Sequence, residues 1–480
     1  MSDRTYDIVI VGAGVIGAAI AWRLSELDLD ILWLEAAHDV AEGASKGNSG
    51  ITASGYDVTP GTLECELVRT SSPQWEAICD DLDVPFRRGG SFVLAFTSED
   101  EARLDGLRAQ AATNGVETAI VSGSEARSIA PAVSEDARAA LHVPSEGIID
   151  PMRLTLGYAE VAARNGVELR LNSEVTAFRH DAAGRVSHIE TTQGAAATRY
   201  VVNAAGLNGD TISRLAGAER FSIWPRKGQF LVVDRDVGAQ VTTIIGSLPT
   251  AQTRGVLAVP TTNGSLLLGP TAEDGRDKSD RDTDEPTLDV VLEQATRLLS
   301  LPISRGDVIK TFAGLRPAST SVYRIERSRL VPNLVQAAAI RSTGVSSSPA
   351  VAARVLKLLC AAGLESRPRS QTVRRLPRVP RLAELRADEI ASAATEDEGY
   401  GVVVCACEHV SAAEIRRALE GPLAATSLGG VRKRTRAGGG RCQGSYCLAG
   451  IGFILSMRNG LAPWQIPETE PAATWGTGAA

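Results

Sequence analysis

Residues 6–17 read YDIVIVGAGVIG, and the rest of the N-terminal domain can be worked out from this stretch. Residues 6–11 are a short, mostly β-branched run, which is typical of a buried parallel strand. Glycines follow at once, and an Ala-rich segment with helical spacing continues to residue 27. A second apolar strand, over residues 31–34, ends at Glu35. Together these parts predict one β-α-β unit with a dinucleotide at its turn.

The glycines form the pattern GxGxxG, and each has a physical task. Gly12 permits the tight turn, Gly14 lets the backbone approach a pyrophosphate, and Gly17 lets the helix pack closely on the strand. The helix N-terminus favours the anion. Glu35 can accept hydrogen bonds from ribose hydroxyls and would repel a 2′-phosphate. The motif alone does not separate NAD from FAD. The predicted cofactor residues in this unit are Gly12, Gly14, Val15, Ile16, Gly17 and Glu35.

Composition excludes several classes of protein. The chain has 480 residues, of which 44% are hydrophobic and 22% charged, as in ordinary globular proteins of about three domains. Its 50 basic and 57 acidic residues do not give the footprint of a nucleic-acid-binding surface. No run of 18 apolar residues predicts a membrane span, and residues 1–12 do not resemble a secretory signal. We therefore expect a cytoplasmic protein.

The pattern of elements changes along the chain. Residues 152–165 predict a helix, and two buried strands follow at residues 168–171 and 200–204. Short extended runs separated by turn signals fill residues 220–325 and favour an antiparallel sheet. Residues 349–364 predict another helix. Residues 365–380 are rich in Arg and Pro, as in an exposed linker, although their charge could instead contact an acidic partner.

Seven cysteines are present, and four of them gather near the C-terminus. Cys405 and Cys407 form CxC, and Cys442 and Cys447 form CxxxxC after 34 intervening residues. Reduced thiols clustered in this way indicate metal ligands rather than disulfides. A four-sulfur set suits zinc or an iron–sulfur cluster, and the spacing alone favours neither strongly. The isolated cysteines, which we expect in the core, are Cys65, Cys79 and Cys360.

Further segments resemble a family of flavoproteins. GASKGNSG (43–50), VNAAGLNGD (202–210) and RSTGVSSSPA (341–350) are similar to FAD enzymes of the glycine-oxidase/D-amino-acid-oxidase superfamily. The resemblance implies an α/β fold: a Rossmann-type FAD-binding domain with an inserted antiparallel-sheet substrate domain. It also implies non-covalent FAD. The further cofactor residues that it implies are Ser45, Asn48, Ser49, Val175, Ala205, Gly206 and Gly344. For Ser45 and Asn48 the alternative is ordinary turn chemistry.

Within that superfamily, three segments resemble the glycerol-3-phosphate dehydrogenase/oxidase branch. They are NSGITASGYD (48–57), WPRKGQF (224–230) and FAGLRPAS (312–319). The resemblance implies that Arg316 binds a substrate anion and that Ser342 lies near the flavin. Arg254 stands where relatives commonly carry Lys, which keeps the charge but changes the shape. The resemblance thus implies Arg316, Arg254 and Ser342 as catalytic residues.

The C-terminal region resembles the bacterioferritin-associated-ferredoxin-like [2Fe-2S] domain. The segments that carry this likeness are YGVVVCACEHVSAAEI (400–415) and VRKRTRAGGGRCQGSYC (431–447). The resemblance implies a small α-rich domain whose cluster is held by Cys405, Cys407, Cys442 and Cys447. Zinc and empty structural thiols stay open as alternatives.

Domain boundaries follow from these segments. The expected FAD-binding domain is discontinuous, as is the substrate domain inserted into it. The predicted ranges are 1–80, 149–215 and 326–364 for the FAD-binding domain, 81–148 and 216–325 for the substrate domain, 365–398 for a linker, 399–460 for the [2Fe-2S] domain and 461–480 for a flexible tail.

The chain departs from the family pattern at one important position. Ala53 stands where relatives carry His, the candidate general base for an alcohol substrate. None of the five histidines has a matching context. Alanine cannot accept a proton, whereas a neutral amine can lose hydride without such a base. The departure therefore favours amine or imino-acid oxidation over simple alcohol oxidation.

These features combined predict an FAD-dependent dehydrogenase. A small polar, anionic substrate with a CH–OH or CH–NH group would give hydride to flavin N5, and electrons would leave through a [2Fe-2S] cluster. The alternatives are an amine or opine-type enzyme and a non-catalytic electron-relay protein within a larger complex. Expected partners are the small-molecule substrate and a second flavoprotein or other electron acceptor, within an oligomer and without nucleic acid.

Overall fold

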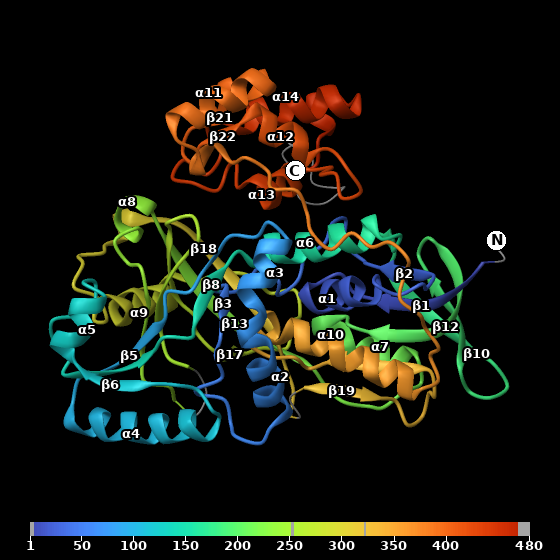
Figure 1. Cartoon of the computed structure of the whole chain (residues 1–480), viewed down its shortest axis with the longest axis horizontal. Helices are drawn as coiled ribbons and strands as arrows, with labels where there is room; N and C mark the ends of the chain where they lie inside the picture. The colour runs from blue at the N-terminus through green and yellow to red at the C-terminus, as the bar shows by residue number, and fades with distance from the viewer. Residues whose placement is uncertain (1–3, 251–253, 321–322, 469–480) are drawn as a thin grey trace.

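The structure is a computed structural model that describes residues 4–250, 254–320 and 323–468. Two domains lie side by side and form an elongated body, and a small third domain rests on one long side of it (Figure 1). We call them the first domain, the sheet domain and the cysteine domain. Among the described residues no helix is long and apolar enough to cross a membrane.

The first domain is built on an eight-stranded sheet whose centre is parallel, as the β-α-β pattern predicts. Its parallel strands are β9 (Glu168–Arg170), β2 (Ile31–Leu34), β1 (Thr5–Val11), β12 (Gly194–Asn203) and β20 (Leu334–Ala338). Its antiparallel additions are β10 (Val175–His180), β11 (Val186–Thr191) and β19 (Arg324–Arg327). The strand at residues 6–11 and its partner at 31–34 therefore lie where the sequence predicts them.

Helices cover both faces of this sheet because successive β1 side chains point to opposite sides. Ile8 and Ile10 pack in one core cluster, and Val9 and Val11 pack in another. The helices of the first domain are α1 (Val15–Leu24), α2 (Leu63–Ser71), η1 (Ser72–Gln74), α3 (Trp75–Asp81), α6 (Pro151–Arg164), η2 (Gly206–Asn208), α7 (Gly209–Leu215) and α10 (Gly344–Ala361). The first cluster holds side chains of α1, α6 and α10, and the second holds Ile212 of α7.

The last of these helices, α10, begins at Gly344, five residues before the predicted start. Pro349 lies inside the helix and cannot donate to the carbonyl of Val345. The hydroxyl of Ser348 donates to that carbonyl instead, at 3.0 Å. A side chain thus replaces the missing backbone bond, and Pro349 does not mark the start of the helix.

The sheet domain contains a nine-stranded sheet in the order β17-β13-β16-β15-β14-β5-β7-β6, with β18 also paired to β13. Its strand pairs are antiparallel, as predicted, except for the parallel pair of β5 and β14. Its strands are β5 (Ser91–Ala95), β6 (Ala119–Ser122), β7 (Ala139–Val143), β13 (Trp224–Val233), β14 (Ile244–Ser247), β15 (Leu257–Pro260), β16 (Leu266–Gly269), β17 (Glu273–Asp274) and β18 (Val308–Ala318).

Helices of the sheet domain pack on this sheet, and a small sheet joins the domain to the first one. The helices are α4 (Ser98–Thr113), α5 (Gly123–Ile129), α8 (Arg235–Gly238), α9 (Glu285–Thr296) and η3 (Arg305–Asp307). The joining sheet consists of β3 (Ile51–Thr52), β8 (Gly147–Ile149) and β4 (Phe86–Arg87). Because β3 follows the glycine-rich loop 43–50 directly, this sheet anchors that loop between the two domains.

Residues 365–380, predicted as an exposed linker, lie against the first domain. The backbone N–H of Arg369 donates to Glu26 O at 2.8 Å, and that of Leu376 donates to Asp81 O at 2.8 Å. Leu376 is buried in the first core cluster, while Arg375 and Arg378 form ion pairs with Asp80. Most of this segment is exposed, as predicted, and acidic groups of the same chain bind its positive charge. Its role as a linker remains a prediction.

The cysteine domain has its own core and sits above α6 (Figure 1). It includes η4 (Leu382–Glu384), α11 (Ala387–Glu396), η5 (Glu398–Gly401), β21 (Val403–Cys405), β22 (Val410–Ser411), α12 (Ala412–Ala418), α13 (Leu428–Thr435), α14 (Leu448–Asn459) and η6 (Pro463–Gln465). Two helices, η4 and α11, thus fall within the predicted linker. The predicted flexible tail is wrong for residues 461–468, because Ile466 is buried in the core of this domain. Residues 469–480 lie outside the described residues.

Candidate cofactor and active site

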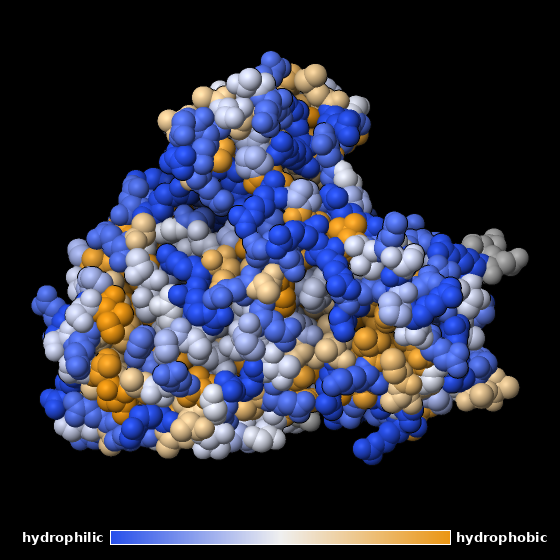
Figure 2. Space-filling view, in the orientation of Figure 1, coloured by the Kyte–Doolittle hydropathy of each residue, from blue (hydrophilic) through white to orange (hydrophobic). Residues whose placement is uncertain are grey.

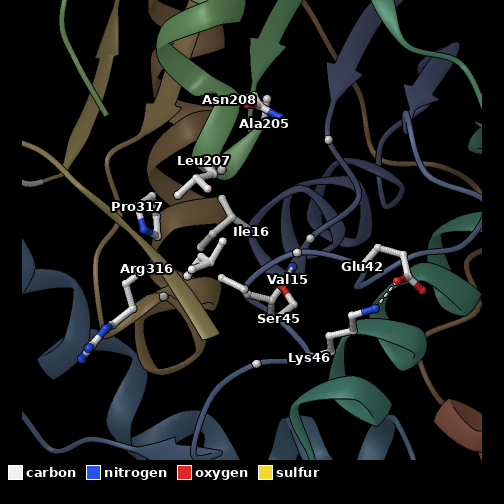
Figure 3. Close-up of a pocket in the computed structure, with 18 of the residues that line it drawn as sticks. Val15, Ile16, Glu42, Ser45, Lys46, Ala205, Leu207, Asn208, Arg316 and Pro317 are labelled. Atoms are coloured by element: carbon white, nitrogen blue, oxygen red, sulfur yellow. Dashed lines mark hydrogen bonds and ion pairs between the residues drawn. The ribbon is translucent and has the colours of Figure 1, made fainter. Parts of the chain in front are cut away.

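A groove of about 550 Å³ runs from the end of β2 to the start of α10. Figure 3 shows Val15, Ile16 and Ser45 on one side of it and Arg316 on another. Twelve of the predicted site residues line it, which brings segments from the whole first domain and from β18 together. They are Gly12, Gly14, Val15, Ile16, Glu35, Ser45, Asn48, Ala205, Gly206, Arg316, Ser342 and Gly344.

The turn after β1 has the shape that a pyrophosphate requires. Gly12 has φ +101°, and a Cβ there would lie 2.6 Å from Ala204 O. A Cβ on Gly17 would lie 1.9 Å from Gly12 O, so helix and turn are in direct contact. A Cβ on Gly14 would meet only Ser45 Oγ, at 3.1 Å. Gly14 therefore leaves the groove open for a ligand at this position. Gly17 instead allows close helix packing and does not line the groove.

The carboxylate of Glu35, just after β2, accepts hydrogen bonds from two backbone N–H groups. Its Oε2 accepts from the N–H of Ala13 at 2.5 Å, and its Oε1 accepts from the N–H of Ala37 at 2.9 Å. An ionised carboxylate offers about four acceptor sites, so both oxygens can still accept from ribose hydroxyls. Asn172 also lines this end of the groove. The sequence did not predict Asn172 as a site residue, although its left-handed backbone (φ +53°) is of a kind that Asn tolerates.

The loop 43–50 is held by its own side chains. Ser45 Oγ accepts from the N–H of Val15 at 2.8 Å, and thus ties the loop to the start of α1. Asn48 Nδ2 donates to Ala44 O and Ser45 O, and its Oδ1 accepts from Gly50 N. Both polar atoms of the Asn48 side chain thus have partners within the loop, which supports the alternative of turn chemistry for this residue.

Besides Gly17, two predicted cofactor residues are absent from the groove lining, Ser49 and Val175. Ser49 lines a second cavity that adjoins the groove. Val175 is buried at the start of β10 and packs in the second core cluster of the first domain. Contact of Ser49 or Val175 with FAD remains a prediction.

Arg316 projects from β18, and no acidic residue in the described part of the chain forms an ion pair with it. Its guanidinium donates to backbone carbonyls of Arg226, Lys227 and Thr271, and it forms no ion pair with any described residue. Burial, reinforced by the charges of Arg226 and Arg341, lowers the pKa of Arg316 to about 10. Its side chain is still cationic at neutral pH. An uncompensated cation on a groove wall can bind an anion.

Arg254 lies in a different, buried cluster. Its Nε is 2.8 Å from Oδ2 of Asp57. Burial alone would lower the pKa of Arg254, but the charges of Asp57, Tyr56 and Glu146 raise it well above its usual range. Arg254 does not line the groove, so its assignment to catalysis remains a prediction.

Ala53 is 1% exposed, and its neighbour Ser54 contacts Glu146 of this cluster. Its N–H donates to Ser346 Oγ in α10 at 2.8 Å. The next residue, Ser54, donates from its backbone N–H to Glu146 Oε1 at 3.3 Å. Burial raises the pKa of Glu146, which the sequence did not mark as a site residue. Residue 53 itself contributes no titratable group.

The four C-terminal cysteines come together in two pairs. Cys407 lies beside Cys442, and Cys447 lies beside Cys405. Among the described residues no group of three or more His, Cys, Asp or Glu side chains has the arrangement of ligands around one metal ion. Two pairs are what a two-iron cluster needs, because each iron takes two thiolates.

Backbone groups around Cys442 favour its thiolate form. The N–H groups of Tyr446, Gly444 and Ser445 lie toward its sulfur, and these hydrogen bonds lower the pKa of Cys442. A Cβ on Gly440 would lie 2.6 Å from Cys407 Cβ, so the chain passes close to that cysteine only because residue 440 is glycine. The two pairs and these amides fit an iron–sulfur cluster better than isolated structural thiols.

Fold and site together define a flavoprotein oxidoreductase that carries an iron–sulfur domain. The chain belongs to the FAD dependent oxidoreductase family, whose model matches residues 7–358, and residues 403–457 match the BFD-like [2Fe-2S] binding domain. Its cofactors are FAD and a [2Fe-2S] cluster.

Comparison with known proteins indicates which branch of this family the chain resembles. The chain is 35% identical over 468 residues to a glycerol 3-phosphate dehydrogenase of Caloramator mitchellensis, covering 96% of each chain. It is 26% identical to one subunit of the anaerobic glycerol-3-phosphate dehydrogenase of Escherichia coli K12, covering 95% of this chain and 89% of that one. The FAD-bound, dithionite-reduced L-α-glycerophosphate oxidase from Mycoplasma pneumoniae superimposes with a TM-score of 0.73 at 25% identity, covering 78% of this chain and all of that one. The resemblance to this branch is confirmed.

Proposed function

We propose that this protein oxidises glycerol 3-phosphate, or a closely similar polyol phosphate, in the groove beside Arg316. The observation that carries the proposal is the position of this cation: it lines the groove and has no acidic partner among the described residues. The names of the relatives support a phosphate-bearing substrate. In this proposal Arg316 holds the phosphate, and Ser342 positions the reacting carbon.

FAD supplies a hydride acceptor when bound, and the [2Fe-2S] cluster supplies one-electron transfer to an acceptor. The residues of this chain bind these two cofactors and orient them. In our proposal Gly14 and Ser45 hold the pyrophosphate at the start of α1, Glu35 holds the ribose, and Gly344 lets the start of α10 approach the flavin ring. Cys405, Cys407, Cys442 and Cys447 hold the cluster.

Anaerobic reduction of the enzyme-bound flavin tests this proposal. The purified holoenzyme is mixed without oxygen with glycerol 3-phosphate, 2-hydroxy acids, amino acids or glycerol. We expect glycerol 3-phosphate to bleach the flavin absorbance and glycerol to fail, because glycerol lacks the anion. Bleaching by amino acids but not by polyol phosphates would reject the proposal.

A second candidate is oxidation of an amine or imino acid, and the buried Ala53 favours it. No proton acceptor stands at this position, and a neutral amine needs none. Ala53→His separates the two candidates. For an alcohol substrate a base at residue 53 should maintain or increase kcat/KM, whereas for an amine it should crowd the site and lower kcat/KM. Ala53→Leu is the matched control for size without basicity.

We also propose an electron-acceptor protein as a partner, because one relative is named as part of a larger enzyme. The alternative of a pure electron relay is tested on the isolated chain. Reduction of an artificial dye by substrate and this chain alone would reject the relay. Co-purification and light scattering would identify the partner and the oligomeric state.

A further inference from the structure

A second cavity, of about 480 Å³, lies where the three domains meet. The loop 46–49 and the start of α6 form one part of it, β16 and β18 of the sheet domain form another, and α13 of the cysteine domain closes it. It adjoins the cofactor groove, because Lys46, Gly47 and Asn48 line both. Figure 2 shows hydrophilic side chains over the junction between the cysteine domain and the body.

The lining of this cavity is strongly basic. Six Lys and Arg side chains line it, against two carboxylates, Glu42 and Asp150. Asp150 caps α6, and its Oδ1 accepts from Met152 N and Arg153 N at 3.0 Å each. Glu42 pairs with Lys46 and Lys433. The basic lining residues are Lys46, Arg281, Lys310, Arg432, Lys433 and Arg436.

Some of these cations have protein partners and two have none. Lys433 also pairs with Asp39 at 2.8 Å, and Arg436 pairs with Glu408 at 3.2 Å. The side chains of Lys310 and Arg432 make no hydrogen bond or ion pair within the described part of the chain, and Arg432 Nε is buried. Lys310 is solvent-exposed and lies near the charges of Arg432, Arg436 and Lys46. A buried donor without a partner, such as Arg432 Nε, with further cations beside it calls for an anion.

The cavity also has an apolar wall. Phe312 lies two residues from Lys310 on the same face of β18, and its ring stacks on Phe230 at 4.8 Å between centroids. The other apolar lining residues are Ile149, Pro151, Met152, Val232, Ala313 and Leu267. A free inorganic ion would leave this wall in contact with water. A ligand with an apolar part beside its anionic group would use both surfaces.

The substrate end of the groove, at Arg316, is distinct from the Lys310 side of this second cavity. Lys310 and Arg316 lie six residues apart on β18, which corresponds to about 20 Å along a strand. One anion therefore cannot contact both side chains. We propose that the three-domain cavity is a binding site for an organic phosphate, with its phosphoryl group between Lys310 and Arg432 and its apolar part against Phe312. Such a ligand would bridge the sheet domain and the cysteine domain.

Calorimetric titration of the holoenzyme, loaded with FAD and cluster, tests this site. The probes are phenyl phosphate, inorganic phosphate and phenol. We expect phenyl phosphate to bind at least tenfold more tightly than inorganic phosphate, and phenol to bind least. The double variant Lys310→Met/Arg432→Gln should lose at least tenfold in affinity for phenyl phosphate. Lys357→Met/Arg458→Gln, which removes two exposed cations elsewhere, should bind as the wild type does.

Three results would overturn the proposal. They are no binding of either phosphate by the wild type, unchanged affinity in the Lys310/Arg432 variant, and loss of binding in Arg316→Gln instead. The last result would place the phosphate in the substrate groove. It would reject the second site without rejecting the proposed function, so the two proposals can fail independently. Circular dichroism, flavin content and iron content confirm that each variant is folded and loaded.

Discussion

Arg434 of the cysteine domain donates two hydrogen bonds to the carboxylate of Asp39 in the first domain. Nη1 lies 2.8 Å from Oδ2, and Nη2 lies 3.1 Å from Oδ1. Both side chains are largely buried, and Lys433 adds an ion pair to the same carboxylate. Asp39 follows β2 by five residues. The strand that leads to Glu35, at the ribose end of the groove, therefore also leads to the contact that holds the cysteine domain.

This contact predicts a specific effect on electron transfer. Arg434→Gln leaves a buried carboxylate with fewer partners, and breaking such a pair costs about 3–5 kcal/mol. We expect substrate to bleach the flavin at the wild-type rate, while transfer onward to the cluster slows. Stopped-flow absorbance after substrate mixing measures both steps. Arg417→Gln, within the cysteine domain but away from Asp39, is the control, and equal slowing in both variants would contradict a docking role.

The same pair predicts a dependence on pH. Burial alone would raise the pKa of Asp39, but the hydrogen bonds of Arg434 and the charge of Lys433 hold it well below its usual range. A lowered pKa in the folded state stabilises the protein above the unfolded-state pKa, near 4, and this contribution is lost as the pH falls further. Thermal unfolding should therefore show a steeper loss of Tm below about pH 4 in the wild type than in Asp39→Asn.

The cofactor groove predicts that Gly14→Val abolishes FAD retention. An added Cβ would contact only Ser45 Oγ, at 3.1 Å, and Gly14 lines the groove, so the valine side chain would occupy the space of the pyrophosphate. The apoprotein should therefore fold normally. Flavin absorbance after gel filtration and circular dichroism measure the two properties. Gly106→Val, at an open position on α4, should retain FAD, and a Gly14→Val protein with full flavin content would disprove the placement of the pyrophosphate.

Arg316→Gln should weaken the use of an anionic substrate. A hydrogen bond to a charged group contributes about 1.5–3 kcal/mol, so kcat/KM should fall about 10- to 100-fold. Arg316→Lys should recover part of the loss, because it restores the charge but not the fork of donors. Steady-state kinetics with an artificial dye give these ratios. The control Arg305→Gln removes a surface ion pair with Asp289 and should leave kcat/KM unchanged. If kcat/KM is also unchanged in Arg316→Gln, the substrate anion binds elsewhere.

Cys442→Ser should separate the two halves of the reaction. Serine is a poor ligand for iron, so the cluster should be lost while the flavin, in another domain, stays bound. Iron and acid-labile sulfide should fall, the reduced-cluster signal in electron paramagnetic resonance should vanish, and substrate should still bleach FAD. The exposed Cys360→Ser is the matched control. Zinc without iron in anaerobically purified wild type would contradict this assignment.

Sequence alone determined the parts that depend on neighbours along the chain. The β-branched run, the glycine spacing and Glu35 lie within 30 residues, so local geometry defines the turn and strand that hold the dinucleotide. The CxC and CxxxxC motifs likewise predict four ligands, whereas only the structure shows that each cysteine of one motif lies beside a cysteine of the other. Pro349 led to a wrong predicted helix start, because the hydroxyl of Ser348 satisfies the carbonyl that the proline leaves without a donor.

Only the tertiary structure decided which charged groups share a site. Arg254 and Arg316 are equally basic in sequence, yet one pairs with buried Asp57 while the other lines the groove without an acidic partner among the described residues. Lys310 and Arg432 lie 122 residues apart and meet only where α13 docks beside β18. The energy of a charge depends on its burial and on its partners in space, and residue order does not specify either.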